Sequence, residues 1–411
     1  MMSKRKISSS EDTDGVPDNK LVTRAKMSIL QLASIFQPKT SKNLMQGVWK
    51  AIPNELFVFT PNCGMENRSK IAGFDMDGTL IRTISGKVFA KNRDDWQLWD
   101  KSHVLQRLRQ AHSEGFKLCI FTNQKGIQKK SVDPNDLKKK VQAILSEIGL
   151  PIQVFISVGT PNYRKPYVGM WTHLEEHENG RIATRTRSKD HSAADRLFAL
   201  NLGVPFQTPE QYFLNKTGEE PYHLPFRAAP VIEFSNQLFD PAETKMPSEC
   251  VELVVLVGSP ASGKSFLAEK WAKEHNYCVV SQDELKTFQS CLKVARERLL
   301  NGQKVIVDCT NRDAATRGRY IELAKSLSIP CRCFVLSCSF EQAQHNNTFR
   351  QIVFRDEQHN GVNDIVLRTF FKAFQAPKFE EGFQEIVRVN FVPNFREEKH
   401  KEIYMMHLLE K

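Results

Sequence analysis

Short apolar runs alternate with amphipathic stretches in the first half of the chain. Apolar residues dominate 71–74, 118–121 and 153–157, and each run has the length of a buried β-strand. Apolar positions recur at helical spacing in 103–112 and 136–148, between these runs. Alternating strands and helices are typical of a parallel sheet covered by helices, so the pattern predicts an α/β domain.

The same alternation returns in the second half of the chain. Apolar runs at 251–257, 277–280, 304–307 and 331–336 predict further strands, with helical stretches between them, and so a second α/β domain. Between the two domains, prolines are dense enough to predict an irregular or surface-packed connection. These prolines are Pro205, Pro209, Pro221, Pro225, Pro230, Pro241 and Pro247.

The shifts in composition divide the chain into five segments. The first is polar and is predicted to be largely disordered, although the spacing of Ile29, Leu32, Ala33 and Phe36 allows one short amphipathic helix. The expected segments are a basic tail at 1–48, the first α/β domain at 49–205, the proline-rich connection at 206–247, the second α/β domain at 248–395 and a C-terminal tail at 396–411.

Charge and composition narrow the class of protein. The 411 residues include 58 Lys and Arg against 47 Asp and Glu, and the net charge of +11 favours a polyanionic partner such as nucleic acid. No apolar run approaches the roughly 18 residues of a membrane span, and the polar N-terminus is not a secretory signal. The nine cysteines are therefore expected to be reduced thiols, with Cys331 and Cys333 in a buried strand.

Two acidic residues follow directly after the first predicted strand, in the run Asp75-Met76-Asp77-Gly78-Thr79. Ligands of open α/β sheets bind at the carboxyl ends of the strands. Side chains two apart in an extended segment point the same way, so Asp75 and Asp77 are expected to face one centre. One carboxylate can attack phosphorus while the other moves a proton, and a Mg²⁺ ion suits their oxygen ligands.

Two further segments are expected at the same centre. Thr122-Asn123-Gln124 ends the second predicted strand and carries hydroxyl and amide groups that suit phosphate oxygens. Arg164-Lys165-Pro166 follows the third, and a lysine there can neutralise both a phosphoryl oxygen and the attacking carboxylate. Together these residues indicate a site for phosphoryl chemistry.

The second domain begins with the spacing of a phosphate-binding loop. Gly258-Ser259-Pro260-Ala261-Ser262-Gly263-Lys264-Ser265 follows a predicted strand and precedes a helical run at 266–275. Backbone N–H groups of such a loop wrap the ATP phosphates, its lysine reaches the β and γ oxygens, and its last serine can bind Mg²⁺. The loop predicts ATP as the phosphoryl donor.

Charged residues at neighbouring strand ends are expected beside this loop. Asp283 follows the next strand and can accept the proton of an attacking hydroxyl, as a base does in kinases. Asp308 ends the strand at 304–307, and Thr310 continues the same edge. Arg350 and Arg355 lie in a helical stretch from which an arginine lid can reach the transferred phosphoryl group.

These motifs resemble known families. FDMDGTL, IFTNQ and RKP resemble the haloacid dehalogenase phosphohydrolases. The longer stretches SGKVF, YRKPYVGMW and ADRLFALNLG resemble the polynucleotide kinase 3′-phosphatase family of DNA end-healing enzymes, and DCTNRDAATRGRY and EQAQHNNTFR resemble its kinase domain. The resemblance spans about 49–393. It implies a haloacid dehalogenase-like phosphatase domain followed by a P-loop kinase domain.

The resemblance also implies a role for each matching residue. The implied roles are Asp75 as nucleophile, Asp77 as general acid and base, Thr122 as phosphate ligand, Lys165 as charge neutraliser, Lys129 and Arg164 as DNA contacts, Asp283 as the base for a DNA 5′-hydroxyl, Asp308 and Thr310 on the substrate side, Arg350 in the lid, and Asp75, Asp77 and Ser265 as Mg²⁺ ligands.

One family motif is not found in the sequence. The family carries a strand and a Gly-Asp turn before its ADRLFALN segment, whereas residues 178–185 here read ENGRIATR. The strand and its aspartate are therefore expected to be absent. Asp190 and Asp195 match acids just downstream, and whether either completes the metal site stays open.

The resemblance predicts a nuclear enzyme that phosphorylates 5′-hydroxyl ends and hydrolyses 3′-phosphate ends of DNA at nicks, gaps and double-strand breaks. Repair scaffold proteins are possible partners, but residues 1–48 are too few for a forkhead-associated domain. Two alternatives stay open. One is a kinase whose weak phosphatase domain serves as a DNA-binding platform, and the other is a kinase and phosphatase fusion acting on small metabolites.

Overall fold

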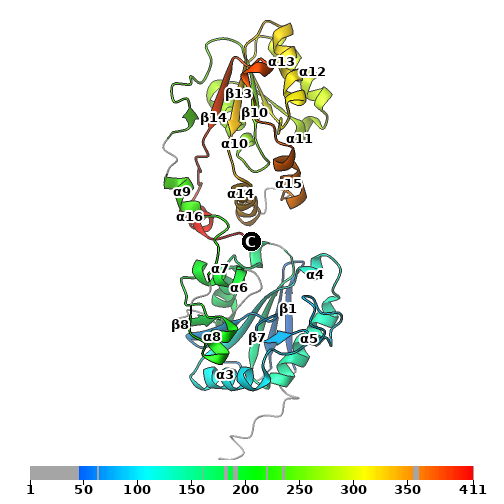
Figure 1. Ribbon diagram of the computed structural model, residues 1–411, viewed down its shortest axis with the longest axis vertical. Helices are drawn as coiled ribbons and strands as arrows, with labels where there is room; N and C mark the ends of the chain where they lie inside the picture. The colour runs from blue at the N-terminus through cyan, green and yellow to red at the C-terminus, as the bar shows by residue number, and fades with distance from the viewer. Residues whose placement is uncertain are drawn as a thin grey trace, which may run out of the picture.

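The computed structural model describes residues 46–62, 64–159, 161–179, 184–187, 193–218, 221–233, 237–354 and 361–410. Most of the predicted N-terminal tail, including its amphipathic helix, lies outside these ranges. The described residues form two α/β domains, one above the other in Figure 1, and each domain is built on its own six-stranded sheet.

The N-terminal sheet has the strand order β1-β2-β7-β6-β3-β8. Its parallel strands are β3 (Lys70–Phe74), β6 (Lys117–Asn123), β7 (Ile152–Ser157) and β8 (Thr184–Arg187), and the antiparallel hairpin of β1 (Gly47–Ile52) and β2 (Leu56–Pro61) extends the sheet beside β7. The strands predicted at 71–74, 118–121 and 153–157 are confirmed. The hairpin was not predicted, and β1 begins at Gly47, inside the segment expected to be a tail.

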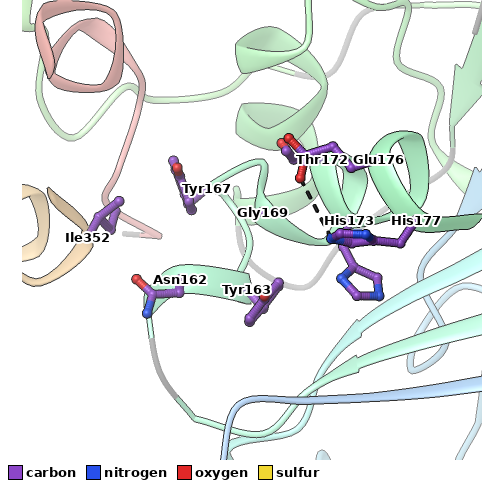
Figure 2. Close-up of a pocket in the computed structure, with 9 residues that line it drawn as sticks. All are labelled: Asn162, Tyr163, Tyr167, Gly169, Thr172, His173, Glu176, His177 and Ile352. Carbon is purple, nitrogen blue, oxygen red and sulfur yellow. Dashed lines mark ion pairs between the residues drawn. The ribbon is translucent and has the colours of Figure 1, made fainter. Parts of the chain in front are cut away.

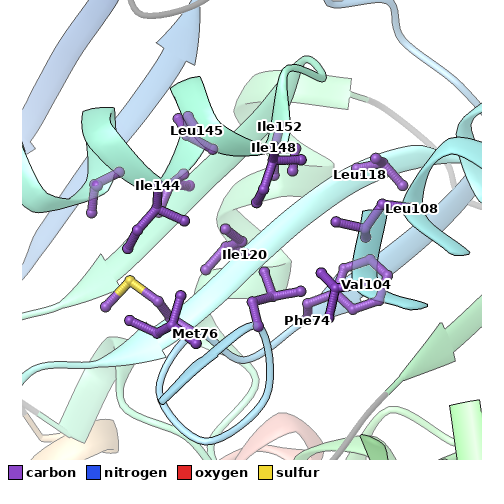
Figure 3. Packing of buried hydrophobic residues seen from close by; sticks show 14 of the residues in the cluster. Phe74, Met76, Val104, Leu108, Leu118, Ile120, Ile144, Leu145, Ile148 and Ile152 are labelled. Atoms are coloured by element: carbon purple, nitrogen blue, oxygen red, sulfur yellow. The ribbon is translucent and has the colours of Figure 1, made fainter. Parts of the chain in front are cut away.

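Two long helices pack on this sheet, α3 (Lys101–Ser113) and α5 (Pro134–Ile148), and both were predicted. The side chains of Asp100 and Asp133 begin them by accepting backbone N–H groups of the first turn. Figure 3 shows the apolar faces of the helices against the sheet. The buried helix residues include Val104, Leu108, Leu137, Val141, Ile144 and Ile148, each worth about 1.5–3 kcal/mol on burial.

The second sheet has the order β11-β12-β10-β13-β14-β9. The strands predicted from apolar runs are confirmed as β10 (Leu253–Val257), β11 (Cys278–Ser281), β12 (Val305–Asp308) and β13 (Cys331–Leu336), and β14 (Glu385–Val389) adds a fifth parallel strand. Cys331 and Cys333 are buried in β13, as expected. Its helices include α10 (Lys264–His275), α12 (Phe288–Leu300), α13 (Ala314–Ser326), α14 (Phe340–Val353) and α15 (Asp364–Ala373).

The proline-rich connection is not irregular throughout. Its described residues include α8 (Pro209–Leu214), α9 (Ala228–Glu233) and β9 (Phe239–Asp240). Phe213 of α8 is buried in the N-terminal core, whereas β9 pairs with β14 of the second sheet. The expected C-terminal tail forms α16 (Glu398–Met405), which lies between the two sheets in Figure 1. Within the described part of the chain, no helix is long and apolar enough to cross a membrane.

Candidate active sites

The carboxyl ends of β3, β6 and β7 bring three of the predicted site residues together. Asp75 follows β3, Thr122 lies near the end of β6, and Lys165 follows β7. Lys165 Nζ lies 2.8 Å from Asp75 Oδ1 and 2.7 Å from the carbonyl oxygen of Phe121. All three predicted residues are buried. The expected nucleophile and the expected charge-neutralising lysine are therefore in direct contact.

A second carboxylate shares the same lysine. Asp195, in α7 (Ala194–Asn201), is 1% exposed, and its Oδ1 lies 2.5 Å from Lys165 Nζ. The sequence identified this aspartate only as an acid near the missing motif. Buried charges are stable only when they are paired, so Lys165 holds together two carboxylates that would otherwise repel each other.

Asp77 is held by a different set of side chains from Asp75. Gly78 has φ +80°, a left-handed conformation that glycine adopts readily, and the chain turns there. Gln124 Nε2 donates to Asp77 Oδ2 at 2.6 Å and to Thr122 Oγ1 at 3.0 Å. Lys140 of α5 lies 3.2 Å from Asp77 Oδ1. Lys140 was not predicted as a site residue, because it stands in a run of three lysines typical of a solvated helix face.

The expected absence of a strand after residue 180 is wrong. β8 pairs in parallel with β3, with Thr184 opposite Lys70 and Arg187 opposite Gly73. The family motif places its acidic residue in the turn after this strand, and residues 188–192, which follow β8, lie outside the described residues. The described residues contain no group of three acidic, histidine or cysteine side chains able to hold a metal ion. Asp190 lies outside the described residues.

The two residues expected to contact DNA have different surroundings. Lys129 is exposed just after α4 (Lys125–Gln128). Arg164 Nη2 donates to Glu410 Oε2 at 3.0 Å, and the two side chains form an ion pair across the domain boundary. No sequence pattern indicated Glu410 as a partner of this arginine.

The phosphate loop has the predicted place between β10 and α10. Gly263 has φ +97° and begins the helix, and a Cβ on Gly258 would lie 2.7 Å from Ser262 Oγ. Lys264 is buried, and its ammonium donates to the carbonyl oxygens of Gly258 at 3.0 Å and Ser259 at 2.7 Å. Burial lowers the pKa of Lys264 to about 8, although the Asp308 carboxylate opposes the shift.

The predicted acids converge beside this lysine. Asp308 ends β12, and burial raises the pKa of its carboxyl, although a hydrogen bond from Ser265 and the charge of Lys264 oppose the shift. Asp283 is exposed in α11 (Gln282–Leu285) rather than at a strand end, and its charge also acts on Lys264. Both carboxylates therefore lie close enough to Lys264 for their charges to act on it.

Other predicted residues lie on the same domain. The carbonyl oxygen of Thr310 accepts from the Gly258 N–H at 3.3 Å, which ties the end of β12 to the phosphate loop. Arg350 lies in α14, where burial lowers the pKa of its guanidinium. Arg355 lies outside the described residues.

A separate pocket of about 240 Å³ opens where the domains meet (Figure 2). It lies between the loop and helix that follow β7 and Ile352 of α14, and none of the predicted catalytic residues lines it. Its lining residues are Asn162, Tyr163, Tyr167, Gly169, Thr172, His173, Glu176, His177 and Ile352.

Known protein families match both domains of the chain. The profile described as "Polynucleotide kinase 3 phosphatase" matches residues 70–213, and the profile described as "AAA domain" matches 253–290 and 286–377. The chain is 34% identical over 191 residues to the polynucleotide 3′-phosphatase ZDP of Arabidopsis thaliana, which covers 40% of this chain and 27% of that protein.

A longer match covers both domains. The chain is 37% identical over 336 residues to the bifunctional polynucleotide phosphatase/kinase of Schizosaccharomyces pombe, which covers 80% of this chain and 81% of that protein. The N-terminal domain is therefore haloacid dehalogenase-like, and the second is a P-loop kinase domain. The chain belongs to the bifunctional polynucleotide phosphatase/kinase family.

Proposed function

We propose that this enzyme prepares broken DNA ends for ligation, by adding phosphate to 5′-hydroxyl ends and removing it from 3′-phosphate ends. The observation that carries the proposal is the presence of two phosphate-handling sites in one chain. Lys165 contacts Asp75 in the first domain, and Lys264 lies in a phosphate loop beside Asp308 in the second. A nuclear location and a role in strand-break repair follow from this proposal.

In the kinase reaction, Asp283 would accept the proton of the 5′-hydroxyl as its oxygen attacks the γ-phosphorus of ATP. The bond from that phosphorus to the β–γ bridging oxygen breaks, and ADP leaves. Lys264 would hold the β and γ oxygens, and Arg350 would approach from α14. Ser265 and Asp308 contact each other and offer only oxygen ligands, which suits Mg²⁺; the ion would offset phosphate charge.

In the phosphatase reaction, a carboxylate oxygen of Asp75 would attack the 3′-phosphate, and the bond to the DNA 3′-oxygen breaks. Asp77 would donate a proton to that oxygen. It would then accept a proton from the water that hydrolyses the phosphoaspartate. Lys165, already beside Asp75, would reduce the repulsion between the carboxylate and the phosphate.

The described residues of the phosphatase site do not complete a Mg²⁺ site. Asp75 and Asp195 both contact Lys165, and Asp77 contacts Lys140 and Gln124, so the described carboxylates of this site are already paired with cationic or amide groups. We therefore infer that this form of the chain is a weak 3′-phosphatase with an intact kinase.

A Mg²⁺ titration of 3′-phosphate release from a defined oligonucleotide tests this inference. We expect slow release that keeps rising as Mg²⁺ passes into the millimolar range, because an incomplete ligand set binds the ion weakly. Full 3′-phosphate release at sub-millimolar Mg²⁺ would show that Mg²⁺ binding does not require the missing acidic residue. If Asp190 supplies the ligand, Asp190→Ala should abolish release, whereas Asp94→Ala, an exposed acid after the active-site turn, should not.

A DNA substrate fits the charge beside the first site. Lys125, Lys129 and Lys130 are exposed directly after β6, whose end carries Thr122. Phosphate contacts made by lysines release counterions, so affinity for a polyanion falls steeply with salt. We expect the KM for a DNA end to rise at least about tenfold between 50 and 200 mM salt. A salt-independent KM would instead favour the fusion acting on small metabolites.

A further inference from the structure

Residues 398–410, here called the domain strap, lie between the two domains. The strap consists of α16 and the five residues after it, and Figure 1 shows α16 beside α9. Four of its side chains are at least nine-tenths buried: Ile403, Tyr404, Leu408 and Leu409. The strap is therefore packed against the molecule along one side, and its charged residues Glu398, Lys401 and Glu402 stay exposed.

The Tyr404 side chain reaches the phosphate loop through one intervening residue. Its hydroxyl donates to Asn346 Oδ1 of α14 at 2.9 Å, and Asn346 Nδ2 donates to the carbonyl oxygen of Ala261 at 3.0 Å. Tyr404 is 2% exposed and Asn346 is 4% exposed. Because water cannot easily replace either partner, breaking this relay leaves buried polar groups unsatisfied.

Ala261 has an unfavourable backbone conformation within the phosphate loop. Its φ of +63° is in the left-handed region, which is uncommon for a residue with a Cβ. The carbonyl of Ala261 shares its planar peptide unit with the N–H of Ser262. Asn346 therefore helps to hold the orientation of this peptide unit, together with the Ser262 N–H, which donates to the carbonyl oxygen of Ser259 at 3.2 Å.

The ring of Tyr404 packs independently of its hydroxyl group. Its centroid lies 4.8 Å from that of His345, 5.2 Å from that of Phe349 and 5.4 Å from that of Phe395. A phenylalanine would keep these contacts and lose only the interactions of the hydroxyl, with Asn346 and with Gln342 of the same helix. The relay can therefore be tested without removing packed atoms from the core.

Three residues after Tyr404, the strap is anchored on the phosphatase domain. The His407 N–H donates to Asn201 Oδ1 at 2.8 Å, and Asn201 Nδ2 donates to the carbonyl oxygens of His407 and Pro166, each at 2.9 Å. Pro166 directly follows the active-site Lys165. Within four residues, the strap thus contacts side chains next to a predicted active-site loop of each domain.

We propose that Tyr404 and Asn346 are positioning residues for the ATP phosphate loop, acting from the domain strap. The inference rests on the proposed function only for ATP binding, and it does not need DNA to be the acceptor. A loop held in its binding conformation before ATP arrives loses less conformational freedom on binding. Breaking the relay should therefore weaken ATP affinity more than it slows phosphoryl transfer at saturating ATP.

The test is calorimetric titration of the full chain with Mg²⁺·ATP in the absence of DNA. Tyr404→Phe is expected to raise the Kd for ATP about three- to tenfold, the usual loss for one buried hydrogen bond. Asn346→Ala should raise the Kd at least as much, and adding Tyr404→Phe to it should change little, because both act through one relay. Tyr222→Phe, the same chemical change at a half-exposed tyrosine, is the matched control and should leave the Kd unchanged.

Two results would overturn the proposal. One is an unchanged Kd in both Tyr404→Phe and Asn346→Ala. The other is a lower thermal unfolding midpoint and a lower kcat with the same Kd, because that pattern reports support of the fold alone. A raised Kd in a chain whose wild type phosphorylates no DNA would contradict the proposed function and still support the relay.

Discussion

Replacing Lys264 with alanine is expected to reduce 5′-phosphorylation by about 10²- to 10³-fold or more while leaving 3′-phosphate release unchanged. The substitution removes the ammonium that would hold the β and γ oxygens of ATP as negative charge shifts between them. The phosphatase residues lie on the other sheet, and none of them contacts Lys264. The two activities should therefore separate when both are followed on doubly labelled DNA.

The matched control for this prediction is Lys270→Ala. Lys270 lies in the same helix, α10, but is exposed, so its loss removes a positive charge without touching the phosphate loop. Both activities of this variant should match the wild type. Loss of both activities in a folded Lys264→Ala protein would contradict the independence of the two sites.

Asp283→Asn is expected to slow phosphoryl transfer by about a hundredfold or more, the usual scale for losing a general base. Asparagine keeps the shape of the side chain but cannot accept the proton of the 5′-hydroxyl. Because Asp283 is exposed and makes no proposed contact with the ATP phosphates, ATP binding should survive the change. Single-turnover transfer with bound ATP, measured beside the Kd for ATP, separates the two effects.

Glu284→Gln is the control for the Asp283 prediction. Glu284 is the next residue of α11 and is also exposed, so the change removes the same charge one position away. Its rate should stay close to that of the wild type. Equal losses in the two variants would indicate a general effect of negative charge and would remove the base role from Asp283.

Residues at strand ends were the most predictable part of both sites. Asp75, Thr122 and Asp308 each end or follow an apolar run, and parallel strands bring such ends to one edge of a sheet. Local sequence therefore specifies both the strand and the place of the polar residue after it. The structure confirms this convergence, whereas the chemical role of each residue stays a prediction.

Residues that act through distant partners could not be predicted. Lys140 reaches Asp77 from 63 residues away, and Tyr404 reaches Asn346 from 58 residues away. Each pairing depends on how a helix packs, and the helix pattern alone does not reveal its neighbour. Lys140 resembled a solvated lysine, and Tyr404 resembled an ordinary residue of a C-terminal tail.

β8 was missed because it differs from a central strand. Its sequence, TRTR, has no apolar residue, whereas the predicted strands were all apolar runs. An edge strand has only one neighbour and tolerates charged side chains, so alternating β-branched residues are enough. The threonines at alternate positions were the signal that could have indicated it.

The most direct test of the account uses a nicked duplex that carries a 3′-phosphate and a 5′-hydroxyl at the nick. The purified chain would be incubated with ATP and Mg²⁺, and each end would be followed by a separate label. The account predicts rapid, ATP-dependent phosphorylation of the 5′ end and slower loss of the 3′-phosphate. No phosphorylation of the 5′ end, under conditions in which the protein binds ATP, would contradict the central claim that this chain is a DNA end-processing kinase.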